Sequence, residues 1–258
     1  QFKYNIRNYR LPLFTHRKMF YRGIIEELLF FISGNTNTKI LEEKNINIWT
    51  GNTSREFLDS RKLFHLPDGD LGAGYSFQLR HFGAEYKDCN SDYTNQGFDQ
   101  LKYIIDLIKN DPNSRRILFS YWNPLAMKSM ALPPCHLLYQ FHVNTDKNEL
   151  SCSFYQRSSD FVLAANFNIV SAAVLTFMLC HITGYKPGKI IHNIGDLHIY
   201  KNHIEETKKM LDNKPYTFPL FYINDPDNKI KNIEDFKYDD FKILFYNSHQ
   251  KYKFTMAI

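Results

Sequence analysis

The chain has 258 residues, of which 43% are hydrophobic, and it carries a formal net charge of +5. This length can enclose a sizeable core. No basic block dominates the positive charge, so a polynucleotide partner is not expected. The four cysteines show no CxxC pair or regular spacing, and no secretory segment is apparent, which indicates a reducing, cytoplasmic location.

Hydrophobic periodicity predicts a mixture of helices and strands. The first helix is expected over 20–33, ended by Gly34 and Asn35, and a second over 98–109, stopped by Asp111 and Pro112. Strands follow at 117–122, 137–143 and 150–157, the last two joined as a hairpin by 144–148. Next come a buried helix over 167–183, an amphipathic helix over 202–211 and a tail with strand-like alternation. This order favours one α+β domain spanning 1–258, without linker or repeat.

The longest apolar run, 161–182, raises the question of a membrane span. It includes Asn166, Asn168, Ser171, Thr176 and His181. We interpret this run as too polar to cross a bilayer, and therefore as a helix buried in the protein.

Cys135 is the first candidate for chemistry. It lies in the segment LPPCHL at 132–137, where two prolines stiffen the backbone ahead of a predicted strand. A thiolate is a strong nucleophile at neutral pH. A cysteine in such a place is more often a small buried hydrophobic residue, so Cys135 needs support from other residues.

Glu27 and Tyr75 are candidates for proton handling. Glu27 lies at the edge of an aromatic and aliphatic helix face, where desolvation would raise its pKa toward neutrality. The alternative is a boundary glutamate that reaches water. Tyr75 follows the glycine-containing segment DLGAG at 70–74, which lacks the third glycine of a dinucleotide site. We expect these glycines to form a turn that presents Tyr75, although Tyr75 alone could be a core aromatic.

Arginines in two places could bind an anion. Arg115 and Arg116 precede a predicted strand, in which neighbouring residues face opposite sides, so one of them could face inward or toward a partner chain. Arg157, between Gln156 and Ser158, combines a guanidinium group with a hydroxyl and free backbone N–H groups, which suits phosphate. A pair of surface arginines is the plain alternative for the first group.

Three further polar positions stand close to apolar runs. Asp160 precedes the buried helix, where an N-cap role is the alternative to a functional one. Asn168 lies inside the apolar run, and its amide matches the edge of a uracil or satisfies a structural hydrogen bond. His198 and Tyr200 are two residues apart and would share a face in an extended segment. The histidines and cysteines show no metal-site spacing, so a metal is not expected.

Taken together, these motifs resemble the thymidylate synthase family over essentially the whole chain. The motifs that carry the resemblance are ELL at 27–29, IW at 48–49, DLG at 70–72, RHFGA at 80–84, RR at 115–116, ALPPCH at 131–136, QRS at 156–158, FNI at 167–169, GD at 195–196 with His198 and Tyr200, and MAI at 256–258.

The resemblance implies an α+β fold of three layers, with a large mixed sheet at the interface of a homodimer. It implies reductive methylation of dUMP to dTMP, with 5,10-methylenetetrahydrofolate as co-substrate and dihydrofolate as product. Cys135 would attack C6 of dUMP, with Glu27 and Tyr75 managing protons. His136 would support the site from behind.

The resemblance also implies the binding roles. The residues expected to hold dUMP are Arg157, Ser158, Gln156, Asp160, Asn168, His198 and Tyr200, with Arg115 and Arg116 contributed by the other subunit. Arginine clustering is expected to depress the pKa of Cys135. The residues expected to line the folate site are Ile48, Trp49, Asn52, Asp160, Leu163, Phe167, Met256 and Ala257. Asp160 and Asn168 are counted among the catalytic residues as well.

The sequence departs from the family pattern in two places that matter here. The family's arginine-bearing phosphate loop lies upstream of residue 1, so one phosphate ligand has no counterpart. The usual Gly-x-Pro-Phe-Asn segment is AANFN at 164–168, which puts an alanine beside the folate. The closest alternative function is a deoxypyrimidine-nucleotide hydroxymethylase on the same scaffold. A nucleic-acid-binding protein and a catalytically inactive relative are weaker alternatives.

Overall fold

The computed structural model describes residues 1–255. Its main sheet has five strands in the order β1-β5-β4-β3-β2, and β6 and β7 form a separate two-stranded sheet. Strands β4 and β5 run parallel, while the other neighbours in the main sheet are antiparallel. The strands are β1 (Phe2–Asn5), β2 (Leu118–Ser120), β3 (His136–Asn144), β4 (Glu149–Asp160), β5 (Lys186–His198), β6 (Leu220–Ile223) and β7 (Phe241–Leu244).

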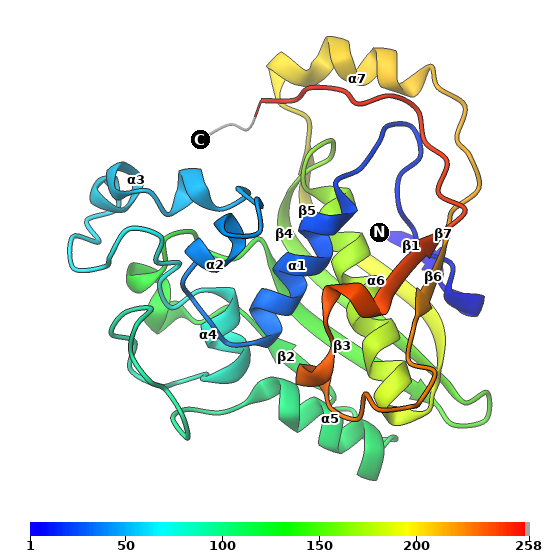
Figure 1. The fold of residues 1–258 in the computed structure, drawn as a ribbon, viewed down its shortest axis with the longest axis horizontal. Coiled ribbons are helices and arrows are strands. Elements are labelled where there is room, and N and C mark those ends of the chain that lie inside the picture. Colours follow the sequence, from blue (N-terminus) through cyan, green and yellow to red (C-terminus); the bar gives the residue numbers. More distant parts are fainter. Residues whose placement is uncertain (256–258) are drawn as a thin grey trace.

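Helix α6 packs against β4 and β5 of the main sheet, α1 packs on α6, and α7 lies at one end of the molecule (Figure 1). Along β4, Cys152, Phe154 and Gln156 are buried, while Ser153 and Tyr155 alternate with them and are more exposed. The expected α+β class with a mixed sheet is therefore confirmed. The helices are α1 (Tyr21–Ile32), α2 (Lys39–Glu42), α3 (Arg55–Ser60), α4 (Tyr75–Arg80), α5 (Gln100–Asn110), α6 (Ala165–Thr183) and α7 (Ile204–Leu211).

The buried helix is α6. By length and composition it is the one helix among residues 1–255 that could cross a membrane, so the polarity argument against a span was wrong. Its place in the protein explains its composition: 78% of its most apolar stretch is buried against the sheet and neighbouring helices. Gly184, with φ of 80°, ends it in the left-handed conformation that a C-cap requires.

The predicted element boundaries fail in two informative places. Strand β4 continues to Asp160, three residues beyond the expected end, because Ser158 and Asp160 pair with Asp196 and His198 of β5. Arg115 and Arg116 lie in a turn before β2, and both are exposed. The two arginines therefore do not face opposite sides of a strand, as was predicted, since β2 begins only at Leu118.

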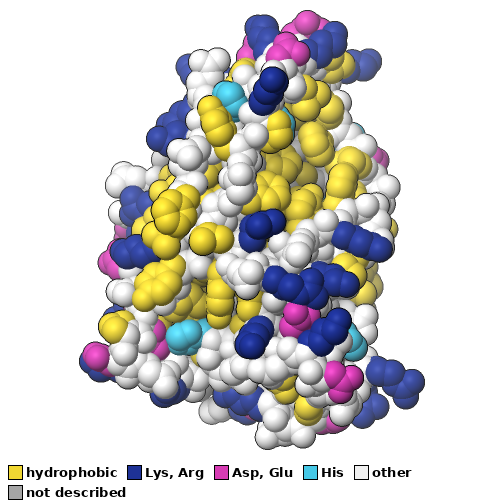
Figure 2. Space-filling view, turned by 90° about the vertical axis from the view of Figure 1, so that its right-hand side faces the viewer, with side chains coloured by type: hydrophobic (Ala, Val, Ile, Leu, Met, Phe, Trp, Pro, Cys, Tyr) yellow, Lys and Arg dark blue, Asp and Glu magenta, His cyan; other side chains and the backbone are white. Residues whose placement is uncertain are grey.

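The other face of the main sheet carries apolar and polar side chains that the chain itself leaves open. Figure 2 shows the right-hand side of the view in Figure 1, where hydrophobic side chains gather in the middle, with lysine and arginine side chains beside them. Large hydrophobic residues of the main sheet that remain exposed on this face include Leu118, Leu138 and Tyr155. Exposed apolar groups on a sheet face suit contact with another protein surface.

Candidate active site

Cys135 immediately precedes β3 and is half-buried. Its backbone N–H donates to the hydroxyl of Tyr75 at 2.8 Å, and its carbonyl accepts from the backbone N–H of Arg157 at 2.9 Å. The two bonds come from α4 and β4. Helix α4 and strand β4 therefore both hold the backbone that carries the Cys135 thiol.

The side chain of Arg157 holds the same segment. Its Nε donates to the carbonyl of Pro134 at 2.9 Å, and its Nη2 donates to that of Pro133 at 3.2 Å and lies 3.6 Å from Sγ of Cys135. Burial raises the pKa of Cys135, and the Arg157 charge lowers it by less. The predicted depression of this pKa was therefore wrong for a single chain, since only one guanidinium group reaches the sulfur.

Tyr75 follows the predicted glycine turn, but its ring is buried in the core, as in the core-aromatic alternative, while its hydroxyl reaches the backbone of Cys135. Gly72 has φ of 73°, and a Cβ there would collide with the carbonyl oxygen of Ser129, so only glycine fits the turn. Tyr75 is the first residue of α4, and its ring stacks between those of Phe31 and His136 at 4.9 and 4.7 Å. Burial raises the pKa of its hydroxyl well above the usual value, so the group stays protonated.

His136 follows the thiol in sequence but cannot act as its base. Burial lowers the pKa of His136 to about 3, so the ring is neutral at physiological pH. Its Nδ1 shares a hydrogen bond of 2.8 Å with the hydroxyl of Tyr139. The ring of His136 instead stacks on that of Tyr75, and its supporting role stays a prediction.

Glu27 lies on α1 with the environment that the sequence suggested. Burial raises its pKa to about 7, and a hydrogen bond of 2.8 Å from the indole Nε1 of Trp49 partly opposes this. A carboxyl group that titrates near neutrality can both give and take a proton. The side chain of Glu27 is nevertheless only partly buried, so it also keeps access to water, as the boundary alternative has it.

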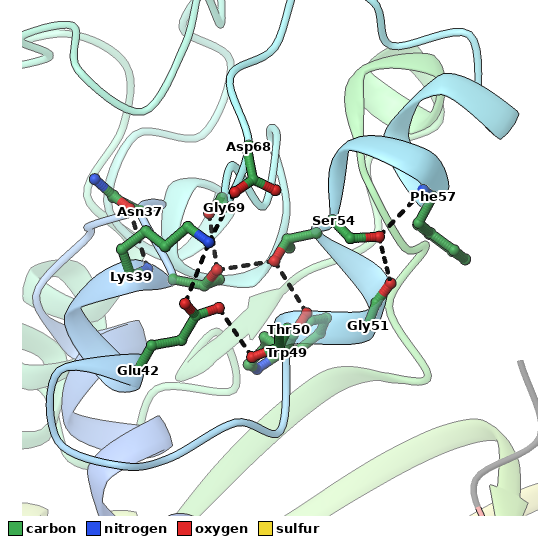
Figure 3. Close-up of polar contacts among 12 residues, drawn as sticks. Asn37, Lys39, Glu42, Trp49, Thr50, Gly51, Ser54, Phe57, Asp68 and Gly69 are labelled. Atoms are coloured by element: carbon green, nitrogen blue, oxygen red, sulfur yellow. Dashed lines mark hydrogen bonds and ion pairs between the residues drawn. The ribbon is translucent and has the colours of Figure 1, made fainter.

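A network of polar contacts holds the loop that carries Trp49 (Figure 3). Lys39 Nζ lies 2.8 Å from the carboxylate of Asp68 and 3.2 Å from that of Glu42. Glu42 also accepts a hydrogen bond from Thr50 Oγ1 at 2.9 Å, directly after the tryptophan. Sequence reasoning missed this network, whose only local signal was the spacing of Lys39 and Glu42 on one helical turn.

Gln156 is fully buried and links β4 to β5. Its Nε2 donates to the carbonyl of Ser158 at 2.9 Å, and its Oε1 accepts from His192 Nε2 at 2.8 Å. Burial lowers the pKa of His192 to about 4, so this donor is neutral. Gln156 therefore fixes the strand end that carries Arg157 and Ser158. His192 was not singled out from the sequence, since nothing local marks it.

Asp160 is not the N-cap of helix α6, which was the alternative considered for it. Its Oδ1 accepts from the backbone N–H groups of Val162 and Leu163 at 3.0 and 3.2 Å, and Ala164 occupies the N-cap of α6. Asp160 therefore stabilises the turn between β4 and α6. It is directly paired with His198 across the two strands.

His198 and Tyr200 lie side by side at the end of β5, as expected. Their rings meet edge to face with centroids 5.2 Å apart, and both are partly exposed. Nδ1 of His198 lies 3.3 Å from the carboxylate of Asp196. Both polar tips remain available to a hydroxyl group of a ligand.

The start of α6 carries two asparagines with different surroundings. Asn166 is buried, accepts from the backbone N–H of Phe14 at 2.9 Å and donates to the carbonyl of Pro12 at 2.9 Å. Asn168 is also largely buried, but part of its amide group remains accessible. This amide makes no hydrogen bond with the described residues. The purely structural hydrogen bond considered for Asn168 is therefore absent from residues 1–255, and its amide can meet a ligand.

The predicted folate residues come from separate parts of the chain. Ile48 and Asn52 flank the buried Trp49, while Leu163 and Phe167 line a cavity of about 490 Å³. Met256 and Ala257 lie outside the described residues. No group of three or more His, Cys, Asp or Glu side chains suited to a metal occurs within 1–255. Cationic side chains also line the cavity, among them Arg17, Lys18, Arg22 and Lys251.

Comparison with known proteins identifies relatives along the whole chain. The family model described as thymidylate synthase matches residues 1–258. Human thymidylate synthase is 50% identical over 258 residues, which is all of this chain and 80% of the human protein. Bifunctional dihydrofolate reductase-thymidylate synthases of Zea mays and Paramecium tetraurelia are 50% and 51% identical, over 100% and 96% of this chain. The chain spans about half the length of these two bifunctional relatives (48% and 52%).

Proposed function

Because this chain belongs to the thymidylate synthase family, we propose that it forms one catalytic domain that methylates dUMP to dTMP. The co-substrate would be 5,10-methylenetetrahydrofolate, which gives a one-carbon unit and a hydride and leaves as dihydrofolate. The observation that carries this proposal is Cys135, with its sulfur 3.6 Å from the Arg157 guanidinium and its backbone bonded to Tyr75. Free cysteines throughout the chain suit a reducing, cytoplasmic location.

The thiol adds to C6 of the pyrimidine, and C5 becomes the nucleophile that takes up the one-carbon unit. Because burial keeps Cys135 protonated in the free protein, its proton passes to bound water as the C–S bond forms. C5 later loses its own proton, and the bond between the one-carbon unit and the folate nitrogen breaks, which leaves a methylene group on C5. The released tetrahydrofolate then delivers a hydride to this methylene carbon and becomes dihydrofolate, while the sulfur departs from C6. Tyr75, which stays protonated, orders the water that receives the C5 proton.

Glu27 supports the proton transfers at the other end of the uracil. Its pKa of about 7 lets it protonate O4 through water while C5 acts as a nucleophile, and recover the proton afterwards. Trp49 keeps the carboxyl group in one orientation through its indole N–H. The folate ring would pack beside Trp49, with Ile48, Asn52, Leu163 and Phe167 around it, and with Met256 and Ala257 closing the site.

The nucleotide would lie along the ends of β4 and β5. Arg157 and Ser158 bind the phosphate, Gln156 and Asp160 hold the strand end and the following turn, and the amide of Asn168 reads N3 and O4 of the base. His198 and Tyr200 would bind the 3′-hydroxyl group, which favours a deoxyribonucleotide. The cationic cavity beside Leu163 and Phe167 suits the glutamate carboxylates of a folate.

A homodimer would complete the phosphate site. The open face of the main sheet exposes Leu138 and Tyr155, which a second copy would cover. Arg115 and Arg116 are exposed in the turn before β2 and form no ion pair with the described residues. In the dimer they would reach the phosphate bound by the other subunit.

The test incubates the protein with dUMP and methylenetetrahydrofolate and follows both products. Dihydrofolate formed in step with dTMP supports the proposal. A hydroxymethylated nucleotide with tetrahydrofolate released would show hydroxymethylase chemistry instead. Absence of both products, with no release of the C5 proton, would contradict catalysis altogether.

A further inference from the structure

His203 joins the C-terminal segment to the interior of the protein. It is the last residue of the 3-10 helix Lys201–His203, directly before α7, and it is only 1% exposed. Its Nε2 lies 2.7 Å from the carbonyl oxygen of Thr255. Because a carbonyl oxygen only accepts hydrogen bonds, Nε2 must carry the proton. The bond therefore ties residue 255 to the start of α7.

The other nitrogen of the same ring faces Asp160. Nδ1 of His203 lies 3.7 Å from Asp160 Oδ2 and makes no hydrogen bond with the described residues. Oδ1 of that carboxylate holds the backbone N–H groups of Val162 and Leu163. One imidazole ring thus lies between the C-terminal segment and the turn that presents Leu163.

A second set of contacts joins the same two parts. The ring of Phe254 packs edge-on against that of His203, with centroids 5.2 Å apart, and the guanidinium carbon of Arg17 lies 5.4 Å from the Phe254 ring centroid. The buried Arg17 in turn donates to the carbonyl of Val162. Phe254 therefore touches two side chains that both reach the turn after Asp160.

The segment that leads to Thr255 is fixed farther back as well. His249 donates from its backbone to the carbonyl of Thr15 at 3.0 Å, and Lys18 donates to that of Gln250 at 3.2 Å. Figure 1 shows this segment running beside α7. The bond to His203 is the last hydrogen bond of the described segment, so it holds residue 255 in place.

We propose that His203 is a positioning residue for the folate site: it holds the segment 254–255 against the turn after Asp160. The inference rests on the proposed function. His203 touches neither substrate in this proposal, since it acts through Thr255 and Asp160.

Two substitutions separate the two sides of the ring. His203→Gln places an amide N–H group near the position of Nε2 and can keep the bond to Thr255. His203→Asn places its amide near the position of Nδ1, so it faces Asp160 and loses Thr255. We expect His203→Asn to raise the KM for methylenetetrahydrofolate about fivefold to tenfold, the effect of one lost buried hydrogen bond. We expect His203→Gln to stay within about twofold of wild type, and both variants to bind dUMP normally.

Hydrogen exchange of the peptide covering 249–255, followed by mass spectrometry without substrates, gives a readout independent of catalysis. Faster exchange in His203→Asn with recovery in His203→Gln supports the proposal. Equal behaviour of the two variants in both measurements overturns it. If the two variants differ in hydrogen exchange but wild type makes no dTMP, the proposed function fails while the positioning role of His203 stands. Should His203→Asn not fold, His203→Met, which fills the space without a donor, takes its place.

Discussion

The two sides of the candidate site are built in different ways. On the nucleotide side, Arg157, Ser158 and His198 lie on paired strands, and Cys135 is bonded through its own backbone. On the folate side, Trp49 and Leu163 lie in loops that side-chain hydrogen bonds hold in place. A backbone ladder survives most single substitutions, whereas a side-chain network loses a contact with each one. Substitutions of the groups on the paired strands should therefore have large effects on catalysis or on dUMP binding, whereas those in the loops of the folate side should weaken folate binding in small steps.

The largest effect is expected from Cys135→Ser. An alcohol is a far weaker nucleophile than a thiol, so kcat should fall at least about a thousandfold. The backbone bonds to Tyr75 and Arg157 do not involve the sulfur, so dUMP binding by calorimetry should change little. Activity within tenfold of wild type would contradict the role of the thiol.

Glu27→Gln should lower kcat by about a hundredfold, the usual contribution of a general acid–base group. The amide can still accept the Trp49 hydrogen bond, so the loop stays in place. Because the carboxyl group titrates at about pH 7, wild-type activity should change near that pH and the variant should lose this inflection. An unchanged pH–rate profile would assign the inflection to another group.

The same substitution makes a prediction for stability. The pKa of Glu27 rises from 4.5 to about 7 on folding, so the folded state binds the proton more tightly. Its contribution to stability is full below pH 4.5 and is lost as pH rises through 7. Between pH 5 and 8, wild type should lose about 1–2 kcal/mol more than Glu27→Gln, after allowance for partial exposure. Denaturant unfolding at both pH values measures the difference, and parallel curves would contradict the raised pKa.

Arg157→Lys should have an intermediate effect on the nucleotide side. Lysine keeps the positive charge but cannot bond both proline carbonyls and a phosphate in the guanidinium geometry. We expect dUMP to bind about tenfold to a hundredfold more weakly. The pH dependence of Cys135 alkylation should move little, since a cation remains nearby. A large shift in that profile, with unchanged dUMP affinity, would reverse this assignment.

The smallest effect is expected from Thr50→Val, in the network around Trp49. It removes one exposed hydrogen bond to Glu42 and preserves the shape of the side chain. The KM for methylenetetrahydrofolate should rise at most about threefold, and dUMP affinity should not change. Glu56→Gln, on the surface of the nearby α3, serves as the matched control. A change in dUMP binding would show that the two sides of the site are not independent.

The sequence predicted the longer elements well because their periodic patterns are local. The helix expected over 20–33 is observed at Tyr21–Ile32, and the hairpin turn at 144–148 joins β3 to β4. It failed where a distant partner decides the outcome. Strand β4 reaches Asp160 because β5 lies beside it, and Arg115 and Arg116 stay in a turn because β2 is short.

The sequence by itself pointed to the proposed nucleophile and to the candidate residues around it, since residue types and their order are carried by the chain alone. Only the tertiary structure decided how these groups behave. Burial raises the pKa of Cys135 although Arg157 is near, brings Glu27 to about 7 and keeps His136 neutral. These outcomes depend on how much solvent the surrounding segments exclude and how close the charges come. Both quantities are set by residues far apart in the sequence, and no local pattern records them.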